Sequence, residues 1–407
     1  MRHTRLALAA MTCGIAISLF TSVAQARDSK VNCNSPGANG RLANVLSRLD
    51  PGETNVVHVS GKCHENLVIT GFDRLSLIAD PGAVLEDASG GQLAVVEIRD
   101  SQRVVVQGFT IRGGNEGLFC RNFSFCRFID DTIEGTSNKG TNDPAGIWIA
   151  VSGARLTNVV VRDAAEQGIA LYQARVIAEN VSISNVTAGD RYPGIGINMV
   201  QSSQLDGGGT GPVTIQDTAG PGVVVRDASH LGLGQLSVKR SGLDGIQLWN
   251  GSNAVLFGPT VTANAQHGVL VGAGSNLELQ GGAVTDNQLV GVNLILGSNA
   301  NIFGSAVTNN FAGVTVFSKS SLIIRGTTVT SNRQFGLYVT DLSYALIDGG
   351  TFALNALLDI ACGDPPVVVQ GIGSVGPAST SCPPSVAAPA NVLKGLSLPP
   401  NPNLPPN

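Results

Sequence analysis

An aspartate and a histidine occupy matching positions of a repeated sequence, which makes them the first candidates for acid–base chemistry. Asp244 directly precedes Gly245, and His267 directly precedes Gly268. If one repeat corresponds to one turn of a regular β structure, the two side chains lie about 5 Å apart. A carboxylate at that distance can orient the imidazole, share a proton with it and raise its pKa.

Three more reactive side chains, Asp190, Arg191 and Tyr192, lie in an inserted segment that reaches the same edge. Removing the proton beside a carboxyl group needs a base, an acid for the leaving oxygen, and a cation for the carboxylate. We expect His267 or Tyr192 to be the base or the acid. Arg191 or Arg226 is the expected cation. The structural alternative is a solvated Asp–His pair at a turn and a loop held by its own salt bridge.

A regular spacing of glycines predicts the secondary-structure elements that must position these residues. Glycines recur every 22 or 23 residues in the second half of the chain, at Gly222, Gly245, Gly268, Gly291, Gly313 and Gly336. Each begins a short apolar strand, which is followed by a turn of small residues, a second alternating strand and a Val-Thr-x-Asn segment. This period leaves no room for a helix and predicts a β solenoid with three strands per coil.

Strand alternation then predicts which side chains point outward. The residue after each repeat glycine points into the solenoid, and the second and fourth point out. The outward set contains both tryptophans, and we expect it to bind substrate through Trp148, Tyr172, Asn198, Arg226, Gln247, Trp249 and Asn293, with Thr315, Phe317 and Tyr338 further along. Aromatic and amide side chains in rows suit a polysaccharide. The alternative is that inserted loops fold over this face and bury the tryptophans.

Asparagines at the end of each repeat have a different interpretation. Asn264, Asn287, Asn310 and Asn332 recur with the same period. We expect them to form a ladder of buried amides that satisfy one another and the turn backbone.

These features resemble the right-handed parallel β-helix, or pectin-lyase-like, superfamily over about residues 40–380. The resemblance implies an all-β right-handed parallel β-helix of about 10 to 12 coils. Asp244-Gly245 and His267-Gly268 also resemble the catalytic edge of polygalacturonases, although that family's Asn-Thr-Asp, adjacent Asp pair and Arg-x-Lys are absent, which argues against hydrolysis by a carboxylate pair. Alginate epimerases of this fold carry Asp-Pro-His-Asp, and the nearest sequence here, 142–145, reads Asn-Asp-Pro-Ala.

The ends of the chain differ from the repeats. Residues 1–26 have the layout of a secretory signal peptide, 27–60 form an expected N-terminal cap with a short helix near 43–49, 61–382 form the β-helix, and 383–407 are a Pro-rich, disordered tail. We therefore expect a secreted or periplasmic protein. No later segment has the roughly 18 apolar residues of a membrane span.

Six cysteines remain after the signal peptide, an even number typical of an oxidising compartment. Fifteen pairings are formally open. Proximity favours Cys33 with Cys63, Cys120 with Cys126, and Cys362 with Cys382. No cysteine spacing indicates a metal site.

Composition excludes some partners and leaves two functions. Charged residues are 13% of the chain and the net charge is −4, so nucleic acid is not expected. The leading hypothesis is a β-helix protein that binds an acidic polysaccharide, with lyase or epimerase activity ahead of hydrolysis. No cofactor is expected. Ca²⁺ is the alternative to an arginine as the cation that neutralises the carboxylate of the sugar. The competing hypothesis is a non-catalytic surface-binding, adhesion or envelope-associated module. The oligomeric state is left open.

Overall fold

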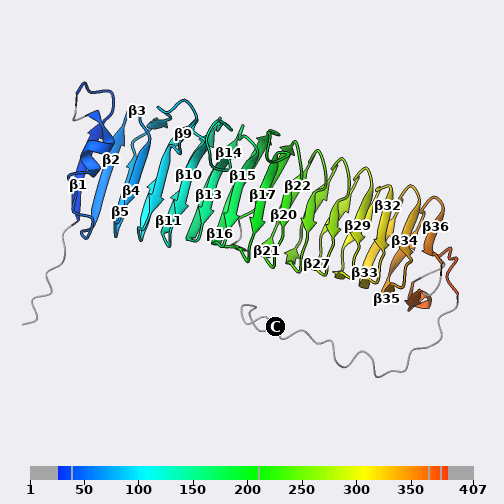
Figure 1. Ribbon diagram of the computed structural model, residues 1–407. Helices are drawn as coiled ribbons and strands as arrows, with labels where there is room; N and C mark the ends of the chain where they lie inside the picture. The colour runs from blue at the N-terminus through cyan, green and yellow to red at the C-terminus, as the bar shows by residue number, and fades with distance from the viewer. Residues whose placement is uncertain (1–25, 38–39, 210, 365–366, 376–377, 384–407) are drawn as a thin grey trace, which may run out of the picture.

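The computed structural model describes residues 26–37, 40–209, 211–364, 367–375 and 378–383. The predicted signal peptide and the predicted disordered tail lie outside these residues, except for Ala26 and Pro383. The described chain winds into one elongated parallel β solenoid (Figure 1). Strands of neighbouring coils pair in parallel, so that Trp148 lies beside Ala170 of the next coil and Ala170 beside Asn198 of the coil after it.

One strand of each coil lies in a 13-stranded sheet, which we call sheet B. Its strands are β4 (Leu67–Thr70), β7 (Val96–Arg99), β10 (Glu116–Arg121), β13 (Ala145–Ala150), β15 (Gln167–Tyr172), β17 (Ile195–Val200), β20 (Val223–Val225), β23 (Ile246–Leu248), β26 (Val269–Val271), β29 (Val290–Leu294), β32 (Ala312–Val316), β34 (Phe335–Val339) and β36 (Leu358–Cys362). The solenoid is therefore longer than the expected 10 to 12 coils. In the first coils and the last, the sheet B strand does not begin with a repeat glycine, so the number of coils expected from the glycine spacing was too small.

The remaining 24 strands form sheet A, which wraps the other sides of the solenoid. Its first half contains β1 (Arg27–Asn32), β2 (Asn55–Ser60), β3 (Lys62–His64), β5 (Leu75–Ala79), β6 (Val84–Glu86), β8 (Val104–Gln107), β9 (Thr110–Arg112), β11 (Phe125–Ile129), β12 (Thr132–Glu134), β14 (Gly153–Arg162), β16 (Arg175–Val186), β18 (Gln204–Gly207) and β19 (Val213–Thr218). Its second half contains β21 (His230–Gly234), β22 (Leu236–Lys239), β24 (Asn253–Phe257), β25 (Thr260–Thr262), β27 (Asn276–Gln280), β28 (Ala283–Thr285), β30 (Asn299–Phe303), β31 (Ala306–Thr308), β33 (Ser321–Thr330), β35 (Tyr344–Ala353) and β37 (Val368–Gln370).

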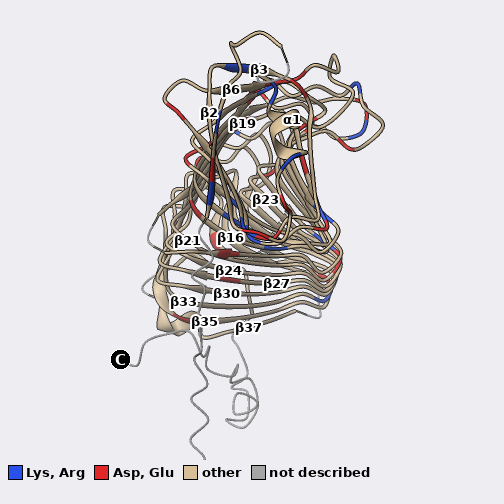
Figure 2. Cartoon of the chain, turned by 90° about the vertical axis from the view of Figure 1, so that its left-hand side faces the viewer, with Lys and Arg blue, Asp and Glu red and all other residues tan. Residues whose placement is uncertain are grey.

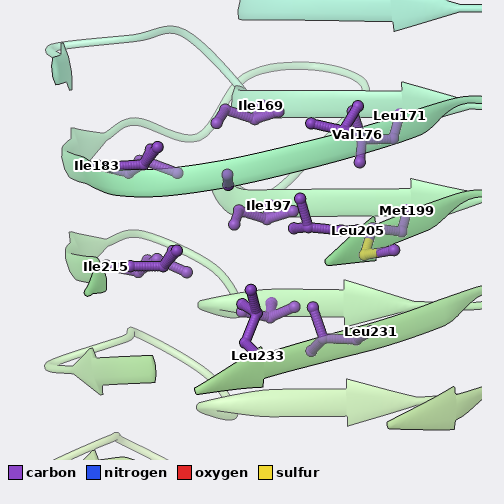
Figure 3. Close-up of a cluster of buried hydrophobic side chains, with 14 of the residues drawn as sticks. Ile169, Leu171, Val176, Ile183, Ile197, Met199, Leu205, Ile215, Leu231 and Leu233 are labelled. Atoms are coloured by element: carbon purple, nitrogen blue, oxygen red, sulfur yellow. The ribbon is translucent and has the colours of Figure 1, made fainter. Parts of the chain in front are cut away.

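The core is a column of aliphatic side chains from all sides of each coil. Ile169, Ile197 and Ile183 are among the buried residues, and equivalent positions stack from coil to coil (Figure 3). β-branched side chains suit this arrangement because they pack well on a pleated surface. The residue after each repeat glycine is buried, as the glycine period predicted.

The N-terminal end is closed by β1 and a single helical turn. α1 (Leu42–Leu46) lies at this end of the solenoid and buries Leu42 and Leu46 (Figure 1). Glu65 accepts hydrogen bonds from the first backbone N–H groups of the helix, at 2.7 Å from Leu42 N. The helix is shorter than the segment expected near 43–49, and a strand that pairs with β2 supplies the rest of the cover. A one-turn 3₁₀ helix, Ile372–Ser374, lies near the other end.

The three cysteine pairings favoured by proximity are confirmed. Cys33 bonds to Cys63 and Cys362 to Cys382, near the two ends of the solenoid. The third disulfide joins Cys120 to Cys126, whose side chains are both buried, and closes the turn between β10 and β11.

The predicted asparagine ladder is also confirmed. Each side-chain amide donates to the next asparagine oxygen, from Asn264 to Asn287 at 2.8 Å and from Asn287 to Asn310 at 2.9 Å. The ladder continues beyond Asn332 to Asn355, which was not predicted, and Asn355 donates to Asp359 at 2.9 Å. Burial opposes ionisation of Asp359, but hydrogen bonds from Ser379 and Asn355 hold its pKa below the usual value.

Candidate functional site

The outward side chains of sheet B fall into two rows along the solenoid axis. Trp148 and Asn198 belong to one row, which is in register through Ala170 of the coil between them. Tyr172 belongs to the second row, and Arg226 and Trp249 directly follow strands β20 and β23. The coils carrying these residues are unequal, because insertions at 135–144 and 187–193 emerge on this side.

Side chains in these rows pack against those of neighbouring coils. In the C-terminal coils they contact one another: Thr315 donates to Asn293 at 2.8 Å, and Phe317 packs against Tyr338 with ring centroids 5.6 Å apart. The Trp249 ring lies on the backbone of Gly272, where an added Cβ would be 2.4 Å from the ring. The Trp249 side chain is therefore half-buried and packs on the backbone of the next coil.

A pocket of about 230 Å³ opens further toward the N-terminus, and we call it the site pocket. Five residues predicted from the sequence line it, namely Trp148, Tyr172, Tyr192, Asn198 and Arg226. Asp143 and Gln167 also line it, and neither was selected from the sequence as a site residue. Trp148 is half-buried and stacks on Phe119 with ring centroids 4.6 Å apart, so one of its faces is already covered.

The two inserted loops meet at Asp143. The Tyr192 hydroxyl donates to Asp143 Oδ2 at 2.9 Å, and the Arg191 guanidinium lies 3.7 Å from Asp143 Oδ1. Burial and the Asp143 carboxylate raise the pKa of Tyr192. Tyr192 is therefore a protonated donor at neutral pH, suited to act as an acid rather than as a base. Asp190 is exposed and does not line the pocket.

Arg191 and Arg226 have different surroundings. Arg191 also donates to the carbonyl oxygens of Asn142 and Gly140, so it ties its loop to the neighbouring one. Arg226 forms none of the salt bridges found among the described residues, and its Nε is buried without a hydrogen-bond partner. Of the two expected cations, Arg226 is the one available to a ligand.

The floor of the pocket contains buried amides. Asn198 Nδ2 donates to Gln167 Oε1 at 2.7 Å, and Gln167 donates to the Pro144 carbonyl oxygen at 3.3 Å. Asn198 Oδ1 has no partner among the described residues. Such an unpaired buried acceptor is unfavourable for folding by about 1 to 3 kcal/mol.

Two buried carboxyl groups support the loops beside the pocket. Glu166 accepts a hydrogen bond from the Arg191 backbone N–H at 3.4 Å, and its Oε2 is buried without a partner among the described residues. Burial raises the pKa of Glu116 to about 7, although Asn115 donates to it at 3.1 Å. Asn115 also accepts from the Gly140 N–H at 2.9 Å and thereby holds the 135–144 loop.

Asp244 and His267 lie on neighbouring coils as predicted, but they do not share a proton. Asp244 accepts from the His267 backbone N–H at 2.8 Å and from the Gln247 side chain at 2.7 Å. His267 Nδ1 accepts from the Val290 N–H at 3.2 Å. The expected rise in the imidazole pKa was wrong: burial lowers the pKa of His267, and Asp244 offsets this only in part.

Among the described residues, one group of side chains lies close enough together to hold a metal ion. Ligand atoms of Cys33, Cys63 and Glu65 lie within 4.8 Å of one another. Because Cys33 and Cys63 form a disulfide, they offer no thiolate. Among the described residues, no helix is long and apolar enough to cross a bilayer.

Comparisons with known proteins agree with this architecture. The family model described as "Right handed beta helix region" matches residues 212–355. A solved structure of the periplasmic alginate epimerase AlgG has 12% sequence identity and a TM-score of 0.51, and the alignment covers 87% of this chain and 84% of that chain. The mannuronan C-5 epimerase AlgE4 A-module of Azotobacter vinelandii has 14% identity and a TM-score of 0.49, over 84% of this chain and 100% of that one. A search of curated proteins gave no match.

The fold expected from the sequence is thereby confirmed: the chain forms a right-handed parallel β-helix, and part of it matches the family model of that name. At these sequence identities, the likeness to solved structures concerns the fold alone.

Proposed function

We propose that the protein binds an acidic polysaccharide and that the site pocket holds one uronate residue of it. The observation that carries this proposal is Arg226, a cation without an ion-pair partner among the described residues, beside Trp148, Tyr172 and the amide of Asn198. Arg226 is placed to pair with the carboxylate of the sugar, and the aromatic side chains offer surfaces for its ring. The AlgG structure, described as an alginate epimerase, supports an acidic sugar chain as the ligand class.

The pocket also contains groups suited to uronate chemistry. Pairing of the carboxylate with Arg226 would stabilise the carbanion formed when the adjacent proton is removed. The carbanion then regains a proton from the other face, which is epimerisation, or expels the neighbouring glycosidic oxygen, which is elimination. Tyr192 can donate the required proton, and Asp143 is the carboxylate placed to accept one from the sugar or from Tyr192.

A non-catalytic carbohydrate-binding module is the second candidate, and a specific observation favours it. The carboxylate and the imidazole expected to do acid–base work at the repeat edge are held by structural hydrogen bonds: Asp244 by two donors and His267 by the Val290 N–H. The raised pKa of Tyr192 also disfavours it as a base. Under this hypothesis the same pocket binds the sugar and changes no bond.

Binding to oligouronates tests the shared claim. Arg226→Gln is expected to weaken binding of mannuronate or galacturonate oligosaccharides at least tenfold in calorimetry, and Trp148→Ala to weaken it severalfold. Trp249→Ala is the matched control, because that ring covers Gly272 outside the pocket. Unchanged binding in Arg226→Gln, or no binding by the wild-type protein, would refute the proposal.

Proton exchange separates the two candidates. An epimerase or lyase incorporates deuterium from D₂O at the carbon beside the carboxyl group, or forms an unsaturated product. Tyr192→Phe and Asp143→Asn should abolish either signal while retaining binding. If the wild-type protein binds but neither reaction is detected with both sugar types, the non-catalytic module is the better explanation.

We further propose a secreted or periplasmic location. The three disulfides support it, because disulfides persist in oxidising compartments. Fractionation of cells that express the full chain tests this location, and recovery only in the reducing cytoplasm would contradict it.

A further inference from the structure

A second cavity, of about 680 Å³, opens at the corner where strands of sheet B turn into sheet A. We call it the corner notch. Its lining includes Phe123, Val151, Gln173, Arg175, Gln201 and Gln204. None of these residues was selected from the sequence.

The notch exists because two successive turns are shorter than their neighbours. A small buried residue, Ser or Ala, marks the corner between sheet B and sheet A in these coils. In most of them, two residues with positive φ directly precede it. Asn122 and Phe123 fill one such turn, and Gln201 and Ser202 fill another. In the two coils between them, a single residue with positive φ occupies this place: Val151 in one coil and Gln173 in the next. The surface is therefore recessed over two coils and bounded by a longer turn on each side.

One aromatic side chain, Phe123, lines the notch. Phe123 is 78% exposed and has a φ of 57°. The neighbouring Phe125 is partly exposed and lies against Gly153, where an added Cβ would be 3.0 Å from its ring. An exposed bulky side chain on a residue with a left-handed backbone conformation does not favour folding. The Cys120–Cys126 disulfide closes this turn and holds its shape.

Polar side chains form the other walls. Arg175 is exposed and forms none of the salt bridges found among the described residues. Gln173 Nε2 lies 3.4 Å from Gln201 Oε1, and Gln204 donates to Asp206 at 2.6 Å. A guanidinium outside any ion pair, several amides and an exposed ring together match the carboxylate, hydroxyl groups and apolar face of an acidic sugar.

The notch adjoins the site pocket. Gln201 lines both cavities. Tyr172 of the site pocket is followed directly by Gln173 of the notch. A ligand that leaves the pocket along the strand direction therefore enters the notch without crossing another coil.

We propose that the corner notch is a second binding site for the same uronate chain, which bends around the corner from sheet B onto sheet A. This inference rests on the proposed function, since it assigns the direction in which the bound chain continues. Arg175 pairs with the carboxylate of a more distant sugar, and Phe123 packs against a sugar ring. The protein should therefore prefer long acidic chains to short ones.

Ligand length provides the test. Binding of a mannuronate disaccharide and of an octasaccharide is measured by calorimetry for the wild-type protein, Phe123→Ala, Arg175→Gln and Arg226→Gln. The notch variants are expected to weaken octasaccharide binding at least fivefold and to leave disaccharide binding unchanged. Arg226→Gln is expected to weaken both. Leu342→Ala removes another exposed apolar side chain with positive φ, and Arg333→Gln removes another exposed cation, so both serve as controls.

The possible outcomes separate the notch from the pocket. If Arg226→Gln weakens binding but neither notch variant weakens octasaccharide binding, the notch proposal is overturned and the proposed function stands. If the notch variants weaken octasaccharide binding and Arg226→Gln has no effect, the notch stands and the pocket proposal fails. If the wild-type protein does not bind the octasaccharide, both fail. Thermal unfolding of each variant confirms that the fold is retained.

Discussion

Two regions of the same solenoid use their polar residues in opposite ways. In the back region, residues 245–355, buried asparagines pair with one another from coil to coil. In the front region, residues 116–228, buried polar atoms without partners occur in Glu116, Asp131, Glu166, Asn198 and Arg226. Among the described residues, none occurs beyond Ser241. The regular coils therefore satisfy their buried polar groups among themselves, and the irregular coils are where the proposed ligand would find unpaired groups.

Charge follows the same division. Figure 2 shows the acidic and basic residues gathered on the N-terminal coils, whereas the coils of β24, β27 and β30 are almost free of them. Residues 251–340 contain only Glu278, Asp286, Lys319, Arg325 and Arg333 as charged side chains. An acidic polymer has few cations to meet in the back region, so the front region is the part suited to bind it.

The largest expected effect is loss of stability in the back region. Asn310→Ala removes an amide that pairs with Asn287, Asn332 and the Val284 carbonyl oxygen. We expect it to lower the free energy of unfolding by about 3 kcal/mol, because several buried groups lose their partners. Denaturant unfolding measures this. Asn301→Ala, on a partly exposed strand position, is the control, and an equal effect of both substitutions would contradict the ladder's role.

The second effect is a change in pH dependence in the front region. Glu116 has its pKa raised to about 7 by burial, so the folded state holds a proton that the unfolded state has released. Stability of the wild-type protein should therefore fall as pH rises from 4.5 to about 7. Glu116→Gln should flatten this slope, to which the buried Asp131 carboxyl group with its raised pKa also contributes, and should be more stable at pH 8 by about 3 kcal/mol.

Unfolding free energies at pH 4.5 and pH 8 check this expectation, with Glu278→Gln of the back region as the control. Identical slopes in the wild-type protein and Glu116→Gln would show that Glu116 ionises normally in the fold.

A third prediction concerns the loop that carries Tyr192. Gly189 packs on Glu166, and an added Cβ would lie 2.1 Å from Glu166 Oε1. Gly189→Ala should displace the loop and weaken oligouronate binding about tenfold, which corresponds to about 1.4 kcal/mol. At Gly234 an added Cβ meets nothing within 4 Å, so Gly234→Ala should bind like the wild-type protein. Wild-type affinity in Gly189→Ala would mean that this loop does not shape the site.

The smallest effect concerns His267, which lies in the back region. Because burial lowers its pKa, the imidazole should titrate below its usual value in NMR spectra. The unfolded state then binds the proton more readily, so the protein loses stability as pH falls below about 6.5. An imidazole pKa above 6.5 would instead support proton sharing with Asp244 and would return this pair to the catalytic candidates.

The fold and the strand alternation could be predicted from the sequence, because both follow from a local period. Gly245 and Gly268 mark strands, Asn264 marks a turn, and the side on which Trp148 lies follows from counting. The same counting placed Asp244 beside His267. It could not show that the Asp244 carboxylate bonds to backbone, because that depends on side-chain rotamers.

The site itself was only partly predictable. Trp148, Tyr172, Asn198 and Arg226 were found because they obey the strand alternation. Asp143 was missed as a site residue because it lies in an insertion, where no period relates a residue to its neighbours in space. The corner notch was missed because it depends on a one-residue difference in turn length between successive coils.

The central claim is that the front region leaves polar groups unpaired for a ligand, and Arg226 tests it most directly. Binding of a uronate octasaccharide and the free energy of unfolding are measured together for the wild-type protein and Arg226→Met. We expect affinity to fall at least tenfold while stability without ligand is unchanged or increased, since a buried unpaired Nε is removed. A large loss of stability with unchanged affinity would contradict this claim and would make Arg226 a structural residue.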